Sequence, residues 1–369
     1  MITRFEVKNF QGFEHLVYDF KSDKRYDFNT HLIKDKIVNS SLIFGKNGSG
    51  KTTLSFALMD IIYCISNSTK ATFPDWKYFN ANAKVKEVYF KYDFDFDGDK
   101  VEYEYVKSSQ NTFVYEKLIV NHKLIIYRNV LDSKNDFINI KGFNSLKTYS
   151  CPNFNSIINY IFAYSLFDQD EIIYKLVMFV NKMSVLKFNQ ERFFLSGYLT
   201  LKNGSVDRNI IEENKLSGLQ SFLNDCGIKY NLVPYKIYSD VGIGVKFNKE
   251  TIIPLVSIAS SGTLDLIIYY YYSTFFNDSS LIILDEFDST YQYNIAKKIY
   301  KSVSTLKNVQ SVLTTHNLLL LDNDYTRPDC LFYLNNNKIK PFSSLCDVNI
   351  RKNNNLLKMY LDGKFNIDF

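Results

Sequence analysis

The sequence predicts an α/β fold with a mixed sheet at its core and an inserted lobe of β-hairpins and helices. A short apolar strand at 41–44 leads through a glycine-rich loop into a helix with apolar residues at helical spacing. In the last third of the chain, helices and apolar strands alternate, which is typical of parallel strands joined by right-handed crossovers. The segment between these two parts shows the strict alternation of antiparallel strands, which indicates an insertion.

The individual elements follow from local patterns. The opening segments 2–7 and 15–20 alternate apolar and polar residues and predict a β-hairpin. Residues 85–126 predict further strands, with Asp97 and Gly98 in a tight turn. The other predicted elements are helical segments at 156–186 and 207–226, strands within 235–256, a helix at 262–276, a strand at 281–284, a helix at 291–307 and a strand at 311–315.

The sheet that begins before residue 45 therefore resumes near residue 280. We expect residues 1–71 and 257–349 to form the core, residues 72–256 to form the inserted β-rich and helical lobe, and residues 350–369 to form a C-terminal helical tail.

Composition limits the possible classes of protein. Hydrophobic residues make up 46% and charged residues 22% of the chain, as in globular proteins. The formal net charge of +5 is spread along the chain, which permits contact with nucleic acid but does not argue for it. Five cysteines without C-x-x-C spacing, no signal peptide, and an apolar run at 266–276 too short to span a bilayer predict a cytoplasmic protein without a membrane segment.

The glycine-rich loop at 45–52 fits the pattern G-x-x-x-x-G-K-[ST]. Its glycines allow backbone N–H groups to surround a phosphate, and the following helix directs its positive end at the same anion. Lys51 would reach the β- and γ-phosphates and Thr52 would bind Mg²⁺. The predicted cofactor-binding residues here are Gly45, Asn47, Gly48, Ser49, Gly50, Lys51, Thr52 and Thr53.

Two further motifs follow buried strands. Asp285 and Glu286 come directly after the strand 281–284, where Asp285 suits the Mg²⁺ shell and Glu286 suits polarising an attacking water. A solvated acidic turn is the alternative, but four strand-forming residues leading into Asp-Glu favour a nucleotide site. His316 ends the next strand, so we expect it to approach the γ-phosphate, although a lone histidine is more often structural.

The segment Ser260-Ser261-Gly262-Thr263 precedes a predicted helix just upstream of the Asp-Glu strand. A serine and a glycine at a helix N-terminus form an anion site, although an ordinary helix cap has the same residues. The order of this segment relative to the other motifs favours the anion site.

The four motifs "GKNGSGKTT", "SSGT", "LIILDEFDS" and "TTHN" occur in the order found in ABC-type ATPase heads. The chain resembles more closely the SMC/RecF-like ATPases of bacterial defence systems, the AAA15-type proteins related to OLD, Septu and abortive-infection ATPases. The resemblance covers residues 1–65 and 255–345 and implies a P-loop NTPase of the ABC-head type that uses ATP and Mg²⁺.

The resemblance also implies how the site works. Ser260, Ser261 and Gly262 of one protomer would contact the γ-phosphate held by another protomer, and Asp288 would belong to the same composite site. ATP would close a homodimer or larger homo-oligomer, and hydrolysis at Glu286 would open it.

Two positions depart from the family pattern. Thr290-Tyr291-Gln292 replaces the Leu-His-Pro that often follows the Asp-Ser of the family. A Mg²⁺-binding glutamine of the kind found in these ATPases has no clear counterpart, and Gln169 is the best candidate by position, with an ordinary polar loop residue as the stronger reading.

The most specific expectation is an ATPase subunit of an antiphage system that controls a separate nuclease or toxin and responds to a phage protein or DNA. Only residues 350–369 follow the last predicted hairpin, which is the reason to expect a separate effector. The alternatives are a RecF-like DNA-repair ATPase that binds DNA directly, and a nucleotide-gated scaffold with negligible hydrolysis.

Overall fold

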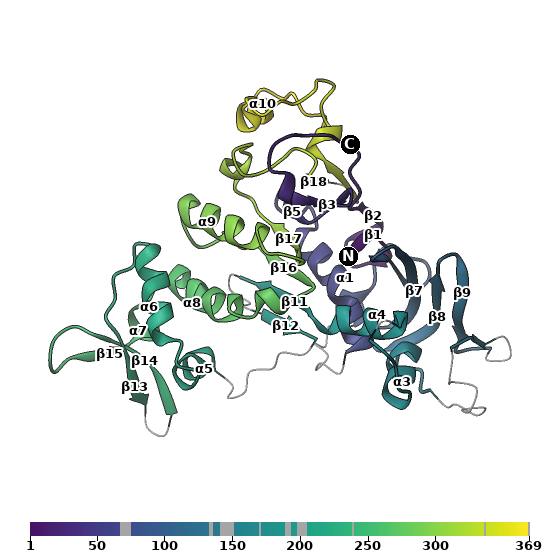
Figure 1. The fold of residues 1–369 in the computed structure, drawn as a ribbon, viewed down its shortest axis with the longest axis horizontal. Coiled ribbons are helices and arrows are strands. Elements are labelled where there is room, and N and C mark those ends of the chain that lie inside the picture. The colour runs from purple at the N-terminus through teal and green to yellow at the C-terminus, as the bar shows by residue number, and fades with distance from the viewer. Residues whose placement is uncertain are drawn as a thin grey trace.

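The computed structural model describes residues 1–66, 75–132, 136–140, 151–169, 171–188, 193–197, 205–237, 240–335 and 337–367. In these residues the fold has two large sheets with a helix between them, and a third, smaller sheet at one side (Figure 1).

The core sheet has seven strands in the order β12-β11-β16-β17-β5-β18-β19. Five neighbouring strands are parallel, and the two outermost strands are antiparallel to their neighbours. Their bounds are β12 Phe193–Ser196, β11 Met183–Lys187, β16 Leu281–Asp285, β17 Gln310–Thr314, β5 Ser40–Phe44, β18 Leu331–Asn335 and β19 Lys338–Pro341. All residues of β5, β16 and β17 are buried, as expected for strands covered on both faces. The predicted mixed sheet with a parallel core is confirmed.

The second sheet is antiparallel, with the order β10-β9-β8-β7-β6-β1-β2. The opening hairpin forms one edge, and β6 pairs with β1. The bounds are β10 Phe137–Ile138, β9 Lys123–Asn129, β8 Thr112–Val120, β7 Asp99–Ser109, β6 Val88–Phe96, β1 Ile2–Phe10 and β2 Phe13–Asp19. The predicted turn at Asp97 and Gly98 joins β6 to β7, and both residues have positive φ.

Helix α1 (Lys51–Ile65) packs between the two sheets and is buried on nearly every side. A buried carboxylate fixes the orientation of α1. Asp60 of this helix accepts hydrogen bonds from Tyr105 at 2.8 Å and from Lys107 at 2.6 Å, both on β7. Because α1 begins at the end of the glycine-rich loop, these contacts tie the loop to the antiparallel sheet.

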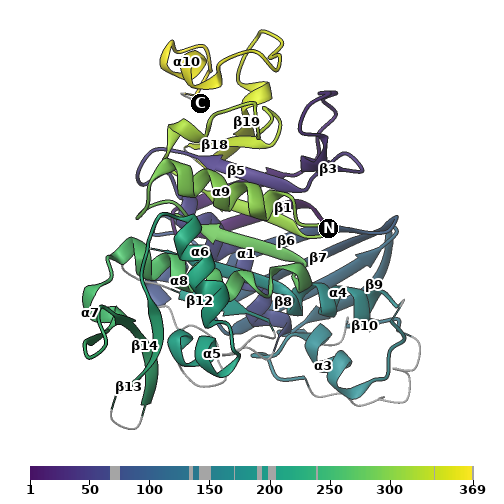
Figure 2. The same ribbon diagram turned by 60° about the vertical axis from the view of Figure 1, so that its left-hand side comes forward.

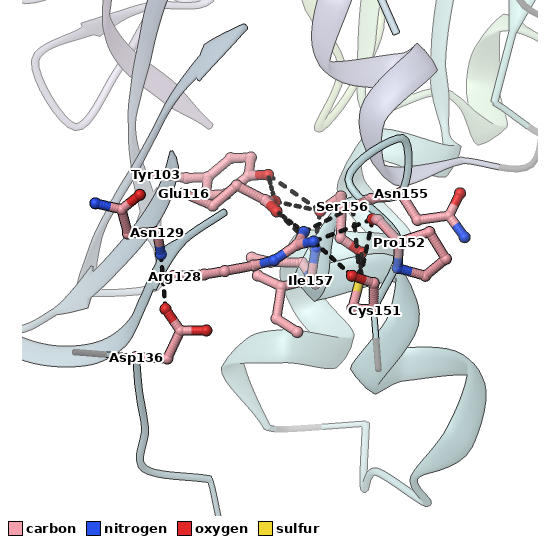
Figure 3. Close-up of polar contacts among 11 residues, drawn as sticks. Tyr103, Glu116, Arg128, Asn129, Asp136, Cys151, Pro152, Asn155, Ser156 and Ile157 are labelled. Atoms are coloured by element: carbon pink, nitrogen blue, oxygen red, sulfur yellow. Dashed lines mark hydrogen bonds and ion pairs between the residues drawn. The ribbon is translucent and has the colours of Figure 1, made fainter. Parts of the chain in front are cut away.

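A second buried charge pair joins the far part of the antiparallel sheet to helix α3 (Ile157–Tyr164). Glu116 on β8 accepts hydrogen bonds from Arg128 at 3.0 Å and from the backbone N–H of Ile157 at 2.8 Å (Figure 3). Arg128 also donates to the carbonyl oxygens of Cys151 and Pro152. Every described contact of this carboxylate is internal, so the cluster fixes the start of α3 on the sheet.

The third sheet, β13-β14-β15, and its helices form a lobe to one side of the core (Figures 1 and 2). The lobe contains β13 Leu232–Ile237, β14 Asp240–Lys246, β15 Ile252–Pro254, α5 Val206–Glu212, α6 Leu216–Asp225 and α7 Leu255–Ile258. Helix α8 (Ser261–Ser273) contacts α6, and the chain after α8 returns to the core sheet as β16. The remaining elements are α2 Asp75–Tyr78, α4 Ile172–Asn181, α9 Tyr293–Ser304, α10 Leu356–Leu361, β3 Ile33–Lys34 and β4 Ile37–Val38. Short 3₁₀ turns lie at Thr30–Leu32, Phe276–Asp278, Leu318–Leu320 and Phe342–Ser344.

The structure corrects two predicted elements. The helical segment predicted to run to residue 186 ends with α4, and residues 183–187 form β11 because an apolar run there pairs with β16. The helix predicted at 207–226 is broken between α5 and α6, where Asn214 has a φ of 56°. Within the segment predicted as a C-terminal helical tail, the structure has one helix of six residues, α10.

The predicted division into domains remains a prediction, and its first boundary, at residues 71 and 72, lies outside the described residues. Residues 72–256 contribute β6–β10 to the antiparallel sheet and β11–β12 to the core sheet, in addition to the side lobe. Among the described helices, none combines the length and apolar character needed to cross a lipid bilayer.

A candidate nucleotide-binding site

The glycine-rich loop lies between the end of β5 and the start of α1. Gly48 and Gly50 have φ values of 75° and 98°, a region that residues with a side chain rarely adopt. A Cβ atom on Gly50 would lie 2.7 Å from the ring of Phe13. The loop therefore needs glycine at these positions, and its backbone is free to surround an anion.

Lys51 points back over the loop from the first turn of α1. Its Nζ atom donates to the carbonyl oxygens of Gly45 at 2.8 Å and Lys46 at 3.1 Å, and lies 3.4 Å from Nδ1 of His316. Burial lowers the pKa of Lys51 from its ordinary 10.5 to about 8, against the opposing effect of the nearby acidic residues. The ammonium group thus lies in a position to meet a phosphate.

Asp285, at the end of β16, is only 1% exposed. Its Oδ1 atom accepts hydrogen bonds from Thr314 at 2.7 Å and from Ser55 at 3.1 Å. Its Oδ2 atom is buried and has no hydrogen-bond partner among the described residues. Burial raises the pKa of Asp285, while the hydroxyl groups of Thr314, Thr52 and Ser55 oppose this shift.

An unpartnered buried carboxylate oxygen close to the hydroxyl of Thr52 fits the hard oxygen ligands that Mg²⁺ prefers. The donor set is small, which suits Mg²⁺ because this ion retains several waters and binds substrate phosphates. The residues present thus agree with the predicted metal role of Asp285 and Thr52, which stays a prediction.

Glu286 has a φ of 50°, in the left-handed region that favours glycine. Its backbone N–H donates to Oγ1 of Thr314 at 2.8 Å, so the same hydroxyl contacts both Asp285 and Glu286. Strained backbone of this kind is concentrated at functional sites. The turn directs the Glu286 side chain to the wall of the loop cavity.

Two further groups lie beyond the ends of β16 and β17. Asp288 accepts a hydrogen bond of 2.7 Å from Oγ1 of Thr315, and burial raises the pKa of Asp288 to about 6. Burial lowers the pKa of His316, and the charge of Lys51 lowers this pKa further. Near neutral pH, His316 is therefore mainly the uncharged imidazole, which can accept a proton.

An open cavity of about 500 Å³ brings most of these groups together. It is lined by Asn47, Gly48, Ser49, Gly50, Lys51, Thr52, Thr53, Glu286, Ser289 and His316. Gly45, Asp285 and Asp288 do not line it. A second cavity of about 380 Å³ lies along the same loop, where Gly12 and Phe13 of the first hairpin face Asn335 and Asn337. Sequence reasoning did not single out this second cavity, because its walls come from hairpins far apart in the chain.

The segment Ser260-Ser261-Gly262 is not part of the loop cavity. Ser260 caps α8 by accepting a 3.2 Å hydrogen bond from the N–H of Thr263, as an ordinary cap does. Gly262 packs against the carbonyl oxygen of Thr290, which a Cβ atom would approach to 2.4 Å. Thr290 also donates a 2.6 Å hydrogen bond to the buried Asp265. The start of α8 is thus held against the segment after Glu286, and Ser260, Ser261 and Gly262 do not line the loop cavity.

Gln169 is exposed in the turn before α4 and does not line the loop cavity. Strand β11 ends at Lys187, which pairs with Asp285. The apolar run at 183–186 was the signal that placed this strand, but sequence reasoning assigned it to a helix.

An α/β core with this loop at the end of β5, and with acidic residues at the end of β16, a parallel strand separated from β5 by β17, defines the class of P-loop nucleotide-binding proteins. Residues 163–322 match the model of a family described as "AAA domain, putative AbiEii toxin, Type IV TA system". This match confirms, for that part of the chain, the resemblance to ATPases of abortive-infection systems. It contains the segment 260–263, the Asp-Glu pair and His316, but not the phosphate loop.

Other similarities are more distant. Over 195 residues the chain is 30% identical to the flagellar motor switch protein FliM of Buchnera aphidicola subsp. Acyrthosiphon pisum (strain APS), covering 49% of this chain and 56% of that protein. The chain thus spans little more than half the length of this curated relative. Two structures of the recombination mediator protein RecF, with ATPrS and with ATP, are 12% and 11% identical and have TM-scores of 0.41 and 0.40. Both cover 92% of this chain, and 98% and 99% of their own chains.

Proposed function

We propose that this chain is the ATP-binding and ATP-hydrolysing subunit of a bacterial antiphage defence system. The observation that carries the proposal is one cavity lined by Lys51, Glu286 and His316, together with the unpartnered, buried Oδ2 atom of Asp285, the residue before Glu286. A phosphate-binding lysine, an unsatisfied buried carboxylate and a second carboxylate at the cavity wall are what nucleoside triphosphate hydrolysis needs.

The loop N–H groups and Lys51 would hold the phosphates, with the base and ribose free to extend along the loop. Asp285 and Thr52 would hold Mg²⁺, which when bound neutralises charge on the β- and γ-phosphates. Lys51 would exchange its present carbonyl partners for phosphate oxygens, which are stronger acceptors because they are charged.

Glu286 would accept the proton of the attacking water, since its carboxylate lies at the cavity wall and its backbone is fixed by Thr314. His316, uncharged near neutral pH, would orient that water or the γ-phosphate from the neighbouring strand. Asp288 stays a proposed part of the composite site; it accepts a hydrogen bond from Thr315 and does not line the cavity.

The position of Ser260-Ser261-Gly262 supports a composite site formed between two copies of the chain. These residues do not reach the cavity of their own protomer, so a contact with the γ-phosphate requires a second protomer. Such a contact gives ATP a higher affinity for the closed dimer than for the monomer, which is the difference a nucleotide-driven switch needs.

The family match over residues 163–322, whose description names a putative AbiEii toxin of a type IV TA system, supports the defence role. The control of a separate nuclease or toxin effector is part of the proposal. The alternative is a RecF-like DNA-repair ATPase that binds DNA directly. Purifying the tagged chain from its native host with and without phage infection separates them: a co-purifying nuclease or toxin supports the first, and recombination proteins support the second.

Mixing two inactive variants tests the composite site directly. Ser260→Arg would block the segment that reaches across, and Lys51→Ala would remove the phosphate contact. Each alone should hydrolyse no ATP, whereas the mixture should regain part of the wild-type rate, because a mixed dimer has one intact site. Ser260→Arg alone should still bind ATP as a monomer. No recovery in a mixture that demonstrably forms mixed dimers would overturn the in-trans assignment.

A further inference from the structure

A cleft separate from both cavities at the phosphate loop lies elsewhere on the molecule. It has a volume of about 680 Å³ and is enclosed by residues 24–28 on one side and 349–354 on the other. Both views show the purple segment around β3 and the yellow C-terminal segment toward the same end of the molecule (Figures 1 and 2). The chain enters β5 from the first of these segments, whereas the phosphate loop leaves the other end of β5. This cleft and the 500 Å³ cavity at the phosphate loop share no lining residue.

The cleft is strongly cationic. Lys24, Arg25, Arg351 and Lys352 line it, and Asp27 is the one carboxylate among the lining residues. None of these four cations forms an ion pair with a described residue. Four cations around one cleft, without ion-pair partners among the described residues, produce a local positive electrostatic potential.

A buried asparagine ties the two walls together. Asn29, next to the first wall, donates to the carbonyl oxygen of Asn323 at 2.8 Å. The side chain of Asn323, only 4% exposed, donates to the carbonyl oxygens of Arg351 and Asn354 in the second wall, both at 3.1 Å. The spacing between the cationic walls is therefore set by the fold, and binding an anion there does not first have to order the walls.

The first wall is also supported from behind. The guanidinium of Arg327 lies 5.3 Å from the centre of the Tyr26 ring and donates to the carbonyl oxygen of Lys24 at 3.4 Å. Arg327 is itself fixed by two hydrogen bonds to Asp329, of 2.8 and 2.9 Å. Tyr26 packs against Phe28 with ring centres 5.3 Å apart. The cleft thus combines exposed cationic side chains with a fixed aromatic floor.

We propose that this cleft binds successive phosphate groups of a polyanion, in addition to the ATP that we propose for the phosphate loop. Phosphate is the anion that several converging arginine and lysine side chains select, because each phosphate accepts several charge-assisted hydrogen bonds. A single-stranded nucleic acid and a free polyphosphate chain present the same chemistry, and an aromatic floor beside cationic walls is typical of single-strand sites.

Charge reversal with a matched control tests the proposal. The test variant carries Arg25→Glu and Arg351→Glu, one from each wall, and the control carries Lys123→Glu and Lys249→Glu, which are exposed and outside the cleft. All proteins also carry Lys51→Ala, which weakens anion binding at the phosphate loop to the same extent in each of them. The probes are a fluorescein-labelled oligothymidylate, followed by anisotropy, and inorganic tripolyphosphate, followed by calorimetry.

The unreversed protein should bind at least one probe, and the cleft variant should bind it about tenfold or more weakly than the control variant. The salt dependence of oligonucleotide binding should also fall, by about 0.7 in log–log slope for each phosphate that the variant no longer neutralises. Binding of the oligonucleotide alone identifies nucleic acid as the source, and binding of tripolyphosphate as well identifies a free polyphosphate as a ligand.

The proposal is wrong if neither probe binds, or if the cleft variant and the control variant bind alike. Equal thermal midpoints for both variants exclude unfolding as the cause of weaker binding. With Lys51 intact and no polyanion added, the cleft variant should hydrolyse ATP at the wild-type rate. A negative result in the polyanion-binding experiment therefore leaves the proposed ATPase function untouched.

Discussion

The hydroxyl of Thr314 on β17 donates a hydrogen bond of 2.7 Å to Oδ1 of Asp285 on the neighbouring strand β16. The same hydroxyl oxygen accepts a hydrogen bond from the N–H of Glu286 at 2.8 Å. One threonine therefore fixes both the carboxylate that we assign to Mg²⁺ and the backbone of the residue that we assign to the water. With Oδ1 occupied in this way, Oδ2 is the oxygen of Asp285 left for a metal.

Replacing Thr314 by valine should weaken Mg²⁺ use without removing any proposed ligand. Valine has the same shape but cannot donate to Asp285, so the carboxylate loses its orientation. We expect the Mg²⁺ concentration for half-maximal hydrolysis to rise about tenfold, which corresponds to about 1.4 kcal/mol. Thr314→Ser keeps the hydroxyl and should restore the wild-type value. Identical Mg²⁺ titrations for the valine and serine variants would remove this role.

The backbone of Glu286 should carry a measurable cost. A residue other than glycine at a φ of 50° is strained by about 1 kcal/mol, and glycine relieves that strain. In urea unfolding, Glu286→Gly should therefore be more stable than Glu286→Ala by about 1 kcal/mol, with both variants inactive. An alanine variant as stable as the glycine variant would show that the turn stores no strain.

Binding of ATP should weaken as the pH rises through the pKa of Lys51. In the free protein this pKa is about 8, below the ordinary 10.5, so Lys51 loses its charge above pH 8, and binding an anion then requires taking up a proton. Calorimetry should show an affinity that is steady with respect to this group below pH 8 and falls by up to about tenfold per pH unit above it. Lys51→Met should bind weakly at every pH, without that added fall.

Lys51 affects folding stability in the opposite direction: its contribution to stability rises as the pH increases. Because the folded pKa of Lys51 lies below the unfolded value, its burial costs stability below pH 8, and this cost is relieved as the pH rises from 8 to 10.5. Any decrease in ATP affinity in this range is therefore not explained by Lys51 destabilising the fold.

The buried pair Glu116–Arg128 should dominate the stability of the antiparallel sheet's outer part (Figure 3). Glu116→Gln leaves the Arg128 charge buried without its partner, and we expect a decrease of about 3 kcal/mol or more in the free energy of unfolding. The exposed pair Arg208–Glu212 provides the control: Glu212→Gln should cost less than about 0.5 kcal/mol. Equal effects of the two substitutions in urea titrations would contradict the structural role of the buried pair.

Local patterns in the sequence predicted the strands and helices that surround the phosphate loop. Strands β5, β16 and β17 are short apolar runs, and each leads directly into the loop or polar motif that it positions. Both signals are continuous in the chain, so a single sequence contains them. The hairpin at Asp97 and Gly98 was equally local, because only a few residue pairs tolerate its positive φ values.

The features that the sequence did not predict depend on contacts between segments far apart in the chain. Strand β11 has the apolar run of a buried helix as well as of a strand, and only its pairing with β16 decides between them. The role of Thr314 required knowing that β16 and β17 are neighbours, and the cationic cleft required bringing residues 24–28 beside 349–354. That Ser260 does not line the cavity of its own phosphate loop is likewise visible only in three dimensions.

The most direct test of the account measures ATP turnover and solution mass, each with and without Mg²⁺-ATP, for the wild type and Glu286→Gln. Glutamine keeps the size of Glu286 but cannot accept the proton from water. We predict slow, Mg²⁺-dependent hydrolysis by the wild type, and a variant that hydrolyses no ATP but accumulates as an ATP-bound dimer or larger assembly. A wild type that hydrolyses no ATP, together with a variant whose mass does not change with ATP, would contradict the account.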